Sequence, residues 1–187
     1  MQAIDALLTR RSARALTEPA PDQGALELIL ACAARAPDHG RLRPWRFVVV
    51  RGAARARFGG LLAAHLRRSH PDVTAESLER ERQKAFRAPL IVVVAARCNA
   101  TIKKVPEIEQ TLSAGASAHA IMLASAALGF AAMWKTGGAA YDIQVKTGLG
   151  LEAGDVIVGF LYLGTDSGER ATVPARDWRE LVSELGA

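Results

Sequence analysis

The chain has 187 residues, of which 50% are hydrophobic and 23% are charged. This balance predicts one folded domain over residues 1–187 and excludes a disordered chain. The two cysteines, Cys32 and Cys98, lack CxxC spacing, which favours free, buried thiols over a disulfide. Because the N-terminal sequence has no apolar segment typical of a secretory signal, we expect a cytoplasmic protein.

Charge is distributed unevenly along the chain. Residues 1–104 hold 16 Arg and 3 Lys against 9 acidic residues, whereas residues 105–187 hold 3 Arg and 2 Lys against 10 acidic residues. This asymmetry favours an anionic ligand bound mainly by the first half, with a solvated, Arg-rich surface as the alternative. Nucleic acid is not an expected partner, since aromatic residues make up only 5% of the chain and do not alternate with basic residues.

The first 52 residues predict two helices followed by a strand. Helical spacing of apolar residues covers 2–9 and 23–35, and the proline-containing sequence TEPAPD at 17–22 separates the two helices. Pro37 should end the second helix, because proline disfavours helical geometry in the residue before it. The sequence WRFVVVRG at 45–52 then predicts a strand.

Two more helices and a second strand are predicted next. Apolar spacing indicates a helix over 53–68, and Asp72 or Thr74 could cap a charged helix over 75–86. The apolar sequence of 87–96 does not alternate with polar residues. We therefore expect a strand that is covered on both faces.

The last third contains a long uncharged segment. Residues 111–134 have no formal charge, but Ala, Gly and Ser predominate, which favours a buried helix ending at Gly129 over a membrane span. A strand over 130–134, a short helix within 141–155 and a strand over 156–165 complete the order. Since helices and strands are interspersed, we expect one layered α/β-type domain.

Several common catalytic sites have no sequence support. The histidines at 39, 65, 70 and 119 form no i, i+4 pair and lie beside no cysteine cluster, so no metal site is predicted. The GxSxG motif of serine hydrolases and the GxGxxG motif of dinucleotide-binding folds are absent.

Three segments could bind an anionic ligand. The sequence TRRSAR at 9–14 offers guanidinium forks and a hydroxyl to a phosphate, although basic residues also stabilise a helix C-terminus. The stiff segment RAPDHGRLRPW at 35–45 could present side chains and backbone N–H groups, or could simply connect a helix to a strand. The sequence MWKTGG at 133–138 combines a cation, a hydroxyl and two glycines, or is simply a strand end.

The order of these segments resembles the nitroreductase family of FMN-dependent oxidoreductases. RRS near residue 10, RAPD before PW, and MWKTG after a small-residue helix carry the resemblance, together with FRAPLIVVVAA and IVGFLYLGT. The likeness runs from about residue 4 to residue 165 and is greater to the minimal bacterial members. It implies an α+β, three-layer fold, with a central mixed or antiparallel sheet flanked by helices. It also implies a homodimer with FMN at the subunit interface, in which the helix at 112–128 packs against its mate.

The resemblance also assigns residues. The implied FMN-binding residues are Arg10, Arg11, Ser12, Arg35, Pro37, His39, Trp134, Lys135 and Thr136. The first three would hold the phosphate and ribityl end, and Arg35 and His39 would reach the flavin from the other subunit. Larger relatives carry Asn and Gln where this chain has Arg41 and Arg43, and an Arg side chain cannot accept a hydrogen bond.

The activity implied by the resemblance is FMN-dependent NAD(P)H oxidation with no catalytic side chain, since the cofactor carries the chemistry. NADH or NADPH would donate hydride to the flavin N5, and a nitroaromatic, quinone or similar small molecule would then accept it in ping-pong turnover. The alternative is a flavin-binding member with a specialised non-nitro substrate or a storage or sensing role. Arg10 or Arg11 is the candidate for stabilising the reduced flavin, and Arg170 or Arg176 could add phosphate contacts.

Overall fold

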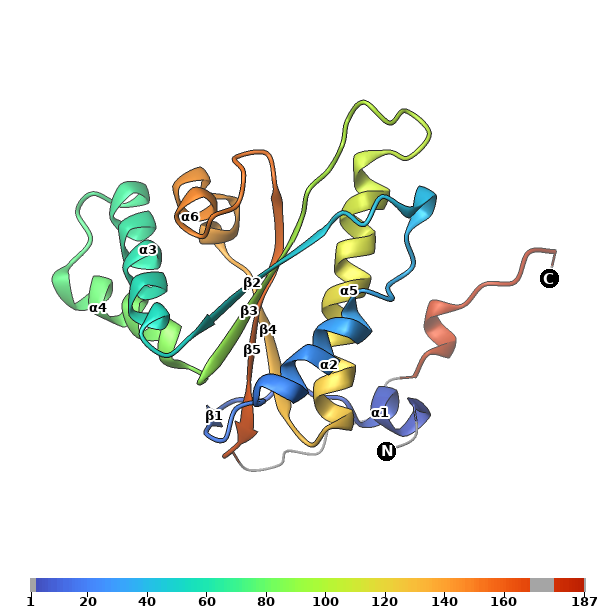
Figure 1. The fold of residues 1–187 in the computed structure, drawn as a ribbon, viewed down its shortest axis with the longest axis horizontal. Coiled ribbons are helices and arrows are strands. Elements are labelled where there is room, and N and C mark those ends of the chain that lie inside the picture. Colours follow the sequence, from blue (N-terminus) through green and yellow to red (C-terminus); the bar gives the residue numbers. More distant parts are fainter. Residues whose placement is uncertain (1–2, 169–176, 187) are drawn as a thin grey trace.

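The computed structural model describes residues 3–168 and 177–186, and its centre is a five-stranded sheet (Figure 1). The strands are β1 (Leu16–Thr17), β2 (Trp45–Arg51), β3 (Leu90–Ala96), β4 (Ala131–Lys135) and β5 (Val156–Asp166). β5 pairs with β3, β4 and β1, and β3 also pairs with β2. Every pairing is antiparallel, so the sheet is antiparallel rather than mixed.

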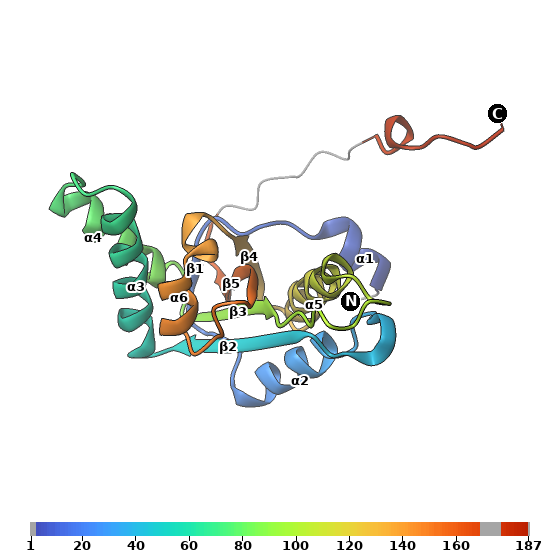
Figure 2. The same cartoon turned by 90° about the horizontal axis from the view of Figure 1, so that it is seen from above.

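Helices cover both faces of the sheet. The α-helices are α1 (Ala3–Thr9), α2 (Gln23–Ala33), α3 (Ala54–Ser69), α4 (Ala75–Gln83), α5 (Glu107–Ala127) and α6 (Ile143–Gly148). Side chains alternate between the two faces of a strand. Thus Val93 and Phe160 share a core with α3 and α6, while Val92 and Leu161 share one with α2 and α5 (Figure 2). The predicted α+β, three-layer architecture is confirmed.

Short 3-10 helices connect several of these elements. They are η1 (His39–Arg41), η2 (Lys84–Phe86), η3 (Gly138–Tyr141) and η4 (Arg179–Leu181). η2 continues the charged helix α4, whose N-cap is Thr74, as one of the two sequence alternatives proposed. η3 follows β4 directly and turns the chain into α6.

β3 and α5 confirm two sequence predictions about burial. All seven residues of β3 are buried, as the non-alternating apolar sequence indicated. α5 packs against α2 and against the sheet through Ala114, Ala118 and Ile121. Its opposite side leaves Ile108 and Leu112 about 62% and 63% exposed, so α5 is only partly buried within one chain. Within the described residues, no helix is long and apolar enough to cross a membrane.

Two expectations were wrong. Cys32 is exposed and Cys98 half-exposed, because α2 turns Leu26 and Ile29 to the core and Cys32 away from it; both thiols are free. α2 ends at Ala33, earlier than the helix predicted over 23–35. The short strand β1 (Leu16–Thr17), where the proline-containing segment begins, was not predicted, because two residues are too few for a periodic signal.

Candidate functional site

β4 has an open edge that could bind a ligand. The Ala13 N–H donates to the Ala132 carbonyl at 3.0 Å on the side away from β5. Backbone groups of alternate residues point to the same edge of an antiparallel strand, so Trp134 presents its N–H and C=O on that side too. Among the described residues, β4 pairs with no strand except β5. The backbone of Trp134 is therefore available to a ligand.

The side chain of Trp134 is fixed on the sheet beside that edge. Its indole N–H donates to the Val158 carbonyl at 3.2 Å. A Cβ on Gly159 would lie 2.2 Å from the indole Nε1, so only glycine leaves room for the ring. Lys135 and Thr136, which follow, are exposed. The three residues predicted from MWKTGG thus lie together at the end of β4.

A cavity of about 350 Å³ lies where α1 and α5 both end, and its lining includes Arg10 and Arg11. The Arg11 guanidinium is paired with the carboxylate of Asp166, and both side chains are largely buried. Arg10 has no ion-pair partner among the described residues. Among the described residues that line this cavity, Arg10 is therefore the cation without an ion pair, whereas the charge of Arg11 is matched by Asp166 on β5. Ser12 is exposed, and Arg170 and Arg176 lie outside the described residues.

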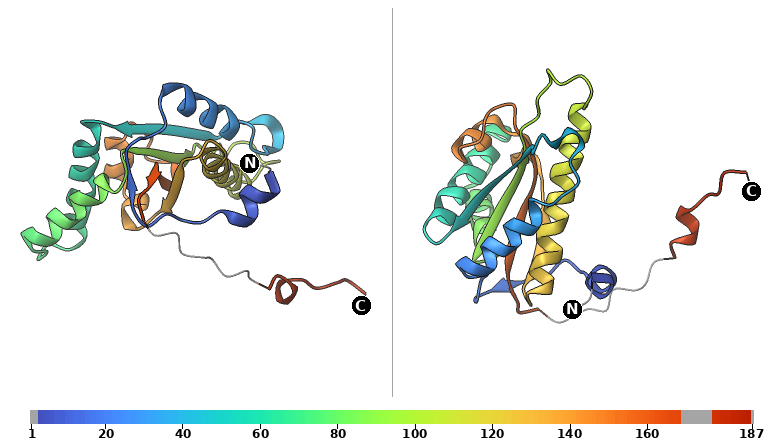
Figure 3. Two further views of the ribbon diagram at one scale, coloured as in Figure 1. Left: turned by 90° about the horizontal axis from the view of Figure 1, so that it is seen from below. Right: turned by 45° about the vertical axis from the view of Figure 1, so that its right-hand side comes forward.

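The third predicted group lies at the other end of α5. The Ser113 hydroxyl donates to the Pro37 carbonyl at 2.8 Å, and His39 Nδ1 lies 2.6 Å from Glu109 Oε2. Both partners belong to the first turns of α5, and Arg35 is exposed nearby in sequence. A helix of 21 residues is about 30 Å long. One chain therefore holds the segment before β2 and the end of α1 near opposite ends of α5 (Figure 3).

The loop before β2 has unusual backbone geometry. Arg41 and Arg43 have φ values of 55° and 49°, and the Asp38 carboxylate accepts a hydrogen bond from the Arg43 N–H at 2.6 Å. Side chains rarely adopt positive φ, although Asn does so more readily than Arg. Asn would therefore suit the backbone geometry at position 41 better than Arg does. Arg46 at the start of β2 is half-buried and donates to the Trp45 carbonyl at 2.9 Å.

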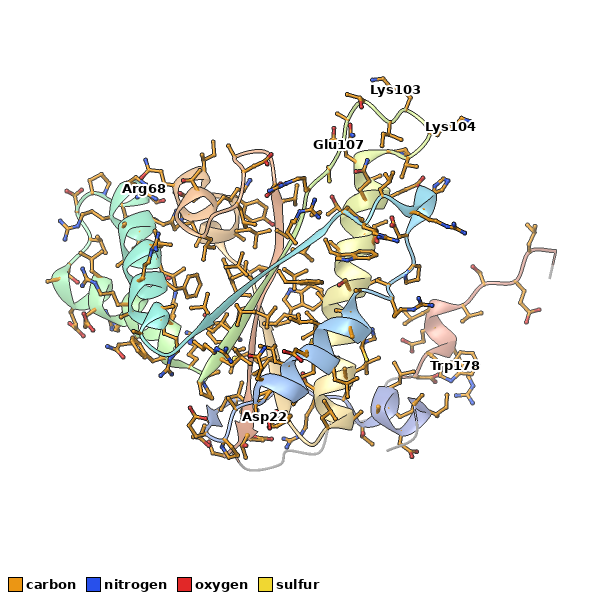
Figure 4. All side chains as sticks on the ribbon, in the orientation of Figure 1. Asp22, Arg68, Lys103, Lys104, Glu107 and Trp178 are labelled. Carbon is orange, nitrogen blue, oxygen red and sulfur yellow. The ribbon has the colours of Figure 1, made fainter. Side chains whose placement is uncertain are left out.

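Sequence reasoning missed a polar network beside Lys135. His65 on α3 lies 2.9 Å from Asp142, and Arg68, labelled in Figure 4, donates to both oxygens of the same carboxylate. Asp142 also caps α6 by accepting from the Val145 N–H. Burial raises the pKa of Asp142, but the hydrogen bonds from His65, Arg68 and Val145 outweigh burial and hold this pKa well below its ordinary value. The Asp at the start of α6 was a detectable cap, but nothing in the sequence paired it with His65.

This network borders a second cavity of about 310 Å³, lined by residues of α3, η2, β5 and the segment Lys135–Ala139. A Cβ on Gly138 would lie 2.8 Å from His65 Nε2, so His65 packs directly on the backbone after Thr136. Among the described residues, no cluster of three or more His, Cys, Asp or Glu side chains could hold a metal ion.

The comparison with known proteins identifies the protein family. The Nitroreductase family model matches residues 7–165, and the chain belongs to that family. Among named proteins, it is 41% identical over 165 residues to "Putative NAD(P)H nitroreductase YdjA" of Escherichia coli K12, covering 88% of each chain. It is 36% identical to a "Putative NAD(P)H nitroreductase" of Haemophilus influenzae, covering 99% of this chain and 100% of that protein.

Solved structures confirm the fold. A nitroreductase-like family protein from Bacillus cereus superposes with a TM-score of 0.84 at 21% identity, covering 100% of this chain and 97% of that one. A nitroreductase from Desulfovibrio desulfuricans, solved in complex with FMN, gives a TM-score of 0.76 at 24% identity, covering 100% and 98%.

Proposed function

We propose that this protein is an FMN-dependent NAD(P)H oxidoreductase that reduces nitroaromatic, quinone or similar electron-accepting small molecules. Relatives at 41% and 36% identity carry the name NAD(P)H nitroreductase, and proteins of the same fold were solved with FMN. The observation that carries the proposal is the open edge of β4 at Trp134, on the strand whose first residues, Ala131 and Ala132, line the Arg10 cavity.

The residues present fit FMN by the chemistry of their donors. A flavin ring has carbonyl and nitrogen atoms at its edge, which suit the backbone groups of Trp134 and the hydroxyl of Thr136. A phosphate suits the guanidinium of Arg10 and the hydroxyl of Ser12, whereas Lys135, which lines the other cavity, would contact the cofactor through its backbone. When bound, FMN supplies hydride acceptance and donation; the residues of this chain bind it, orient it and balance its charge.

We infer that the complete site needs two subunits. Pro37 and His39 contact Ser113 and Glu109 in the first turns of α5, whereas the Arg10 cavity is lined by Met122 and Ala126, about 14–26 Å further along that helix. Antiparallel pairing of two α5 helices about a two-fold axis brings the start of one helix beside the end of the other. The exposed side chains of Ile108 and Leu112 support such pairing, because apolar surface of this kind is stabilised by burial.

The experiment that tests the proposal is reduction of the purified protein in the absence of oxygen. We expect a yellow protein whose flavin absorbance bleaches with NADH or NADPH and returns when a nitroaromatic or quinone is added. A colourless protein that takes up no added FMN would contradict the proposal. A yellow protein that no nicotinamide reduces would contradict the NAD(P)H part and favour a storage, sensing or specialised role.

A further inference from the structure

The 310 Å³ cavity beside Lys135 has a lining rich in hydrogen-bond donors. It lies between α3, η2 and the end of β4, and its polar lining includes His65, Glu81, Lys84, Arg87, Lys135 and Tyr162. Leu62, Leu66 and Phe160 provide an apolar wall. A pocket of this size holds one small ring with its substituents. It is distinct from the Arg10 cavity, with which it shares no lining residue.

The charges of this lining do not cancel. Glu81 pairs with Lys84 at 2.5 Å, so one carboxylate and one ammonium are matched. His65 Nδ1 is held by Asp142. Among the described residues, Arg87 and Lys135 have no carboxylate partner. His70 at the outer rim adds an imidazole, and the cavity therefore favours an anion.

Tyr162 points to the same conclusion. The residue is only 2% exposed, lines the cavity, and its hydroxyl makes no hydrogen bond to any described residue. Burial raises the pKa of Tyr162 to about 12, although the nearby charge of Arg87 lowers it. The hydroxyl therefore stays protonated at neutral pH and can donate. Since Tyr162 lines the cavity and its hydroxyl has no partner among the described residues, a ligand oxygen bound there could accept its hydrogen bond.

We propose that this cavity binds the carboxylate of an aromatic electron acceptor, with Arg87, Lys135 and the Tyr162 hydroxyl as donors. The proposal rests on the proposed oxidoreductase function, since it names the class of substrate. A planar carboxylate matches a guanidinium fork and accepts a third hydrogen bond from a hydroxyl. The aromatic ring of the acceptor would pack against the apolar wall, beside the segment that follows Trp134.

The test compares 4-nitrobenzoate with 4-nitrobenzyl alcohol, which has a similar shape but no charge. Calorimetry measures the binding of each to the full-length protein with and without FMN, and turnover measures kcat/KM for each. The variants are Arg87→Gln and Tyr162→Phe. Arg67→Gln is the matched control, because Arg67 is exposed on α3 and does not line the cavity.

We expect the wild-type protein to bind 4-nitrobenzoate at least about tenfold more tightly than the alcohol. Arg87→Gln should reduce that preference about tenfold, and Tyr162→Phe about threefold, without loosening FMN. Arg67→Gln should leave the preference unchanged. Equal binding of acid and alcohol would overturn the proposal, as would variants that weaken FMN but keep the preference. A protein that binds no FMN would refute the proposed function, while calorimetry with 4-nitrobenzoate would still decide for or against the cavity.

Discussion

Arg10 and Arg11 are neighbours in sequence but differ in what their charges do. Arg11 is held by Asp166, whose side chain is 12% exposed, and so ties the N-terminal segment to the end of β5. Arg10 lines the same cavity without a described partner. Because a cation already paired with a carboxylate has less charge to offer a phosphate, Arg10 is the better candidate for FMN binding.

Exchange of each arginine separates these roles. Arg10→Gln should raise the Kd for FMN about 10- to 100-fold, because a charge-assisted hydrogen bond to the phosphate is lost. The free energy of unfolding should change little. Arg11→Gln should lower the free energy of unfolding by about 1–3 kcal/mol, because Asp166 would keep a buried charge without its partner. Fluorescence titration with FMN and urea unfolding of the apoprotein measure the two. If Arg11→Gln instead weakened FMN binding and Arg10→Gln lowered the free energy of unfolding, the phosphate would be assigned to Arg11.

Asp142 predicts how stability depends on pH. Its pKa lies below the ordinary value of 3.8 in the folded protein, so its contribution is present above that value and is lost as pH falls through the lower, folded pKa. Asp142→Asn should lower the free energy of unfolding by about 1–3 kcal/mol at neutral pH. It should also flatten the loss of stability from about pH 5 to pH 2. Urea unfolding across this range is the measurement, and parallel curves for the two proteins would refute the assignment.

At the scale of the elements, the packing of α3 against α4 depends on one of two adjacent glycines. A Cβ on Gly59 would lie 2.7 Å from the backbone oxygen of Arg82, whereas a Cβ on Gly60 would meet nothing within 4 Å. Both glycines lie inside α3 and have ordinary helical geometry. The close approach of α3 to α4 therefore requires glycine at position 59 but not at position 60. The same approach positions the cavity at η2.

Alanine at these positions should have opposite effects. Gly59→Ala should lower the free energy of unfolding by about 1–3 kcal/mol, because the helices must separate. Gly60→Ala should raise it by about 0.5–1 kcal/mol, since alanine favours the helix and restricts the unfolded chain. Urea unfolding compares the two variants. Equal stabilities would show that α3 and α4 do not pack as described.

The helices and strands were more predictable from sequence than the contacts between them. β3 was recognisable because seven consecutive apolar residues need cover on both faces, and α5 because small residues suit close packing. Local patterns, however, carry no information about contacts between distant residues. His65 and Asp142 are 77 positions apart, and Arg11 and Asp166 are 155 positions apart.

The same limit applies to the candidate site. The segments containing Arg10 and Trp134 could be proposed as ligand-binding from sequence, because their residue types match phosphate and flavin chemistry. The ion pair of Arg11 with Asp166 could not be predicted from sequence, because Asp166 stands at the end of a strand, where a charged residue is common. Tyr162 was hidden as one more apolar position in β5, because its burial depends on elements packed over the sheet.

At the scale of the whole molecule, the site segments are divided between two ends of one helix. The contacts of Pro37 and His39 with the first turns of α5 hold both residues away from the Arg10 cavity of the same chain. Two subunits related by a two-fold axis would resolve this separation, and each dimer would then hold two equivalent sites. We infer that each FMN site is shared between the two subunits.

A heterodimer tests this claim most directly. Chains carrying Arg10→Gln and chains carrying Arg35→Gln, with different purification tags, are co-expressed, and dimers holding one of each are isolated. Homodimers of either variant should bind FMN weakly. In the heterodimer, one shared site combines the two intact residues and the other combines both changes, so we predict about one FMN per dimer at wild-type affinity. If the heterodimer instead binds FMN as weakly as both parents, each site is built within a single chain and the account is wrong.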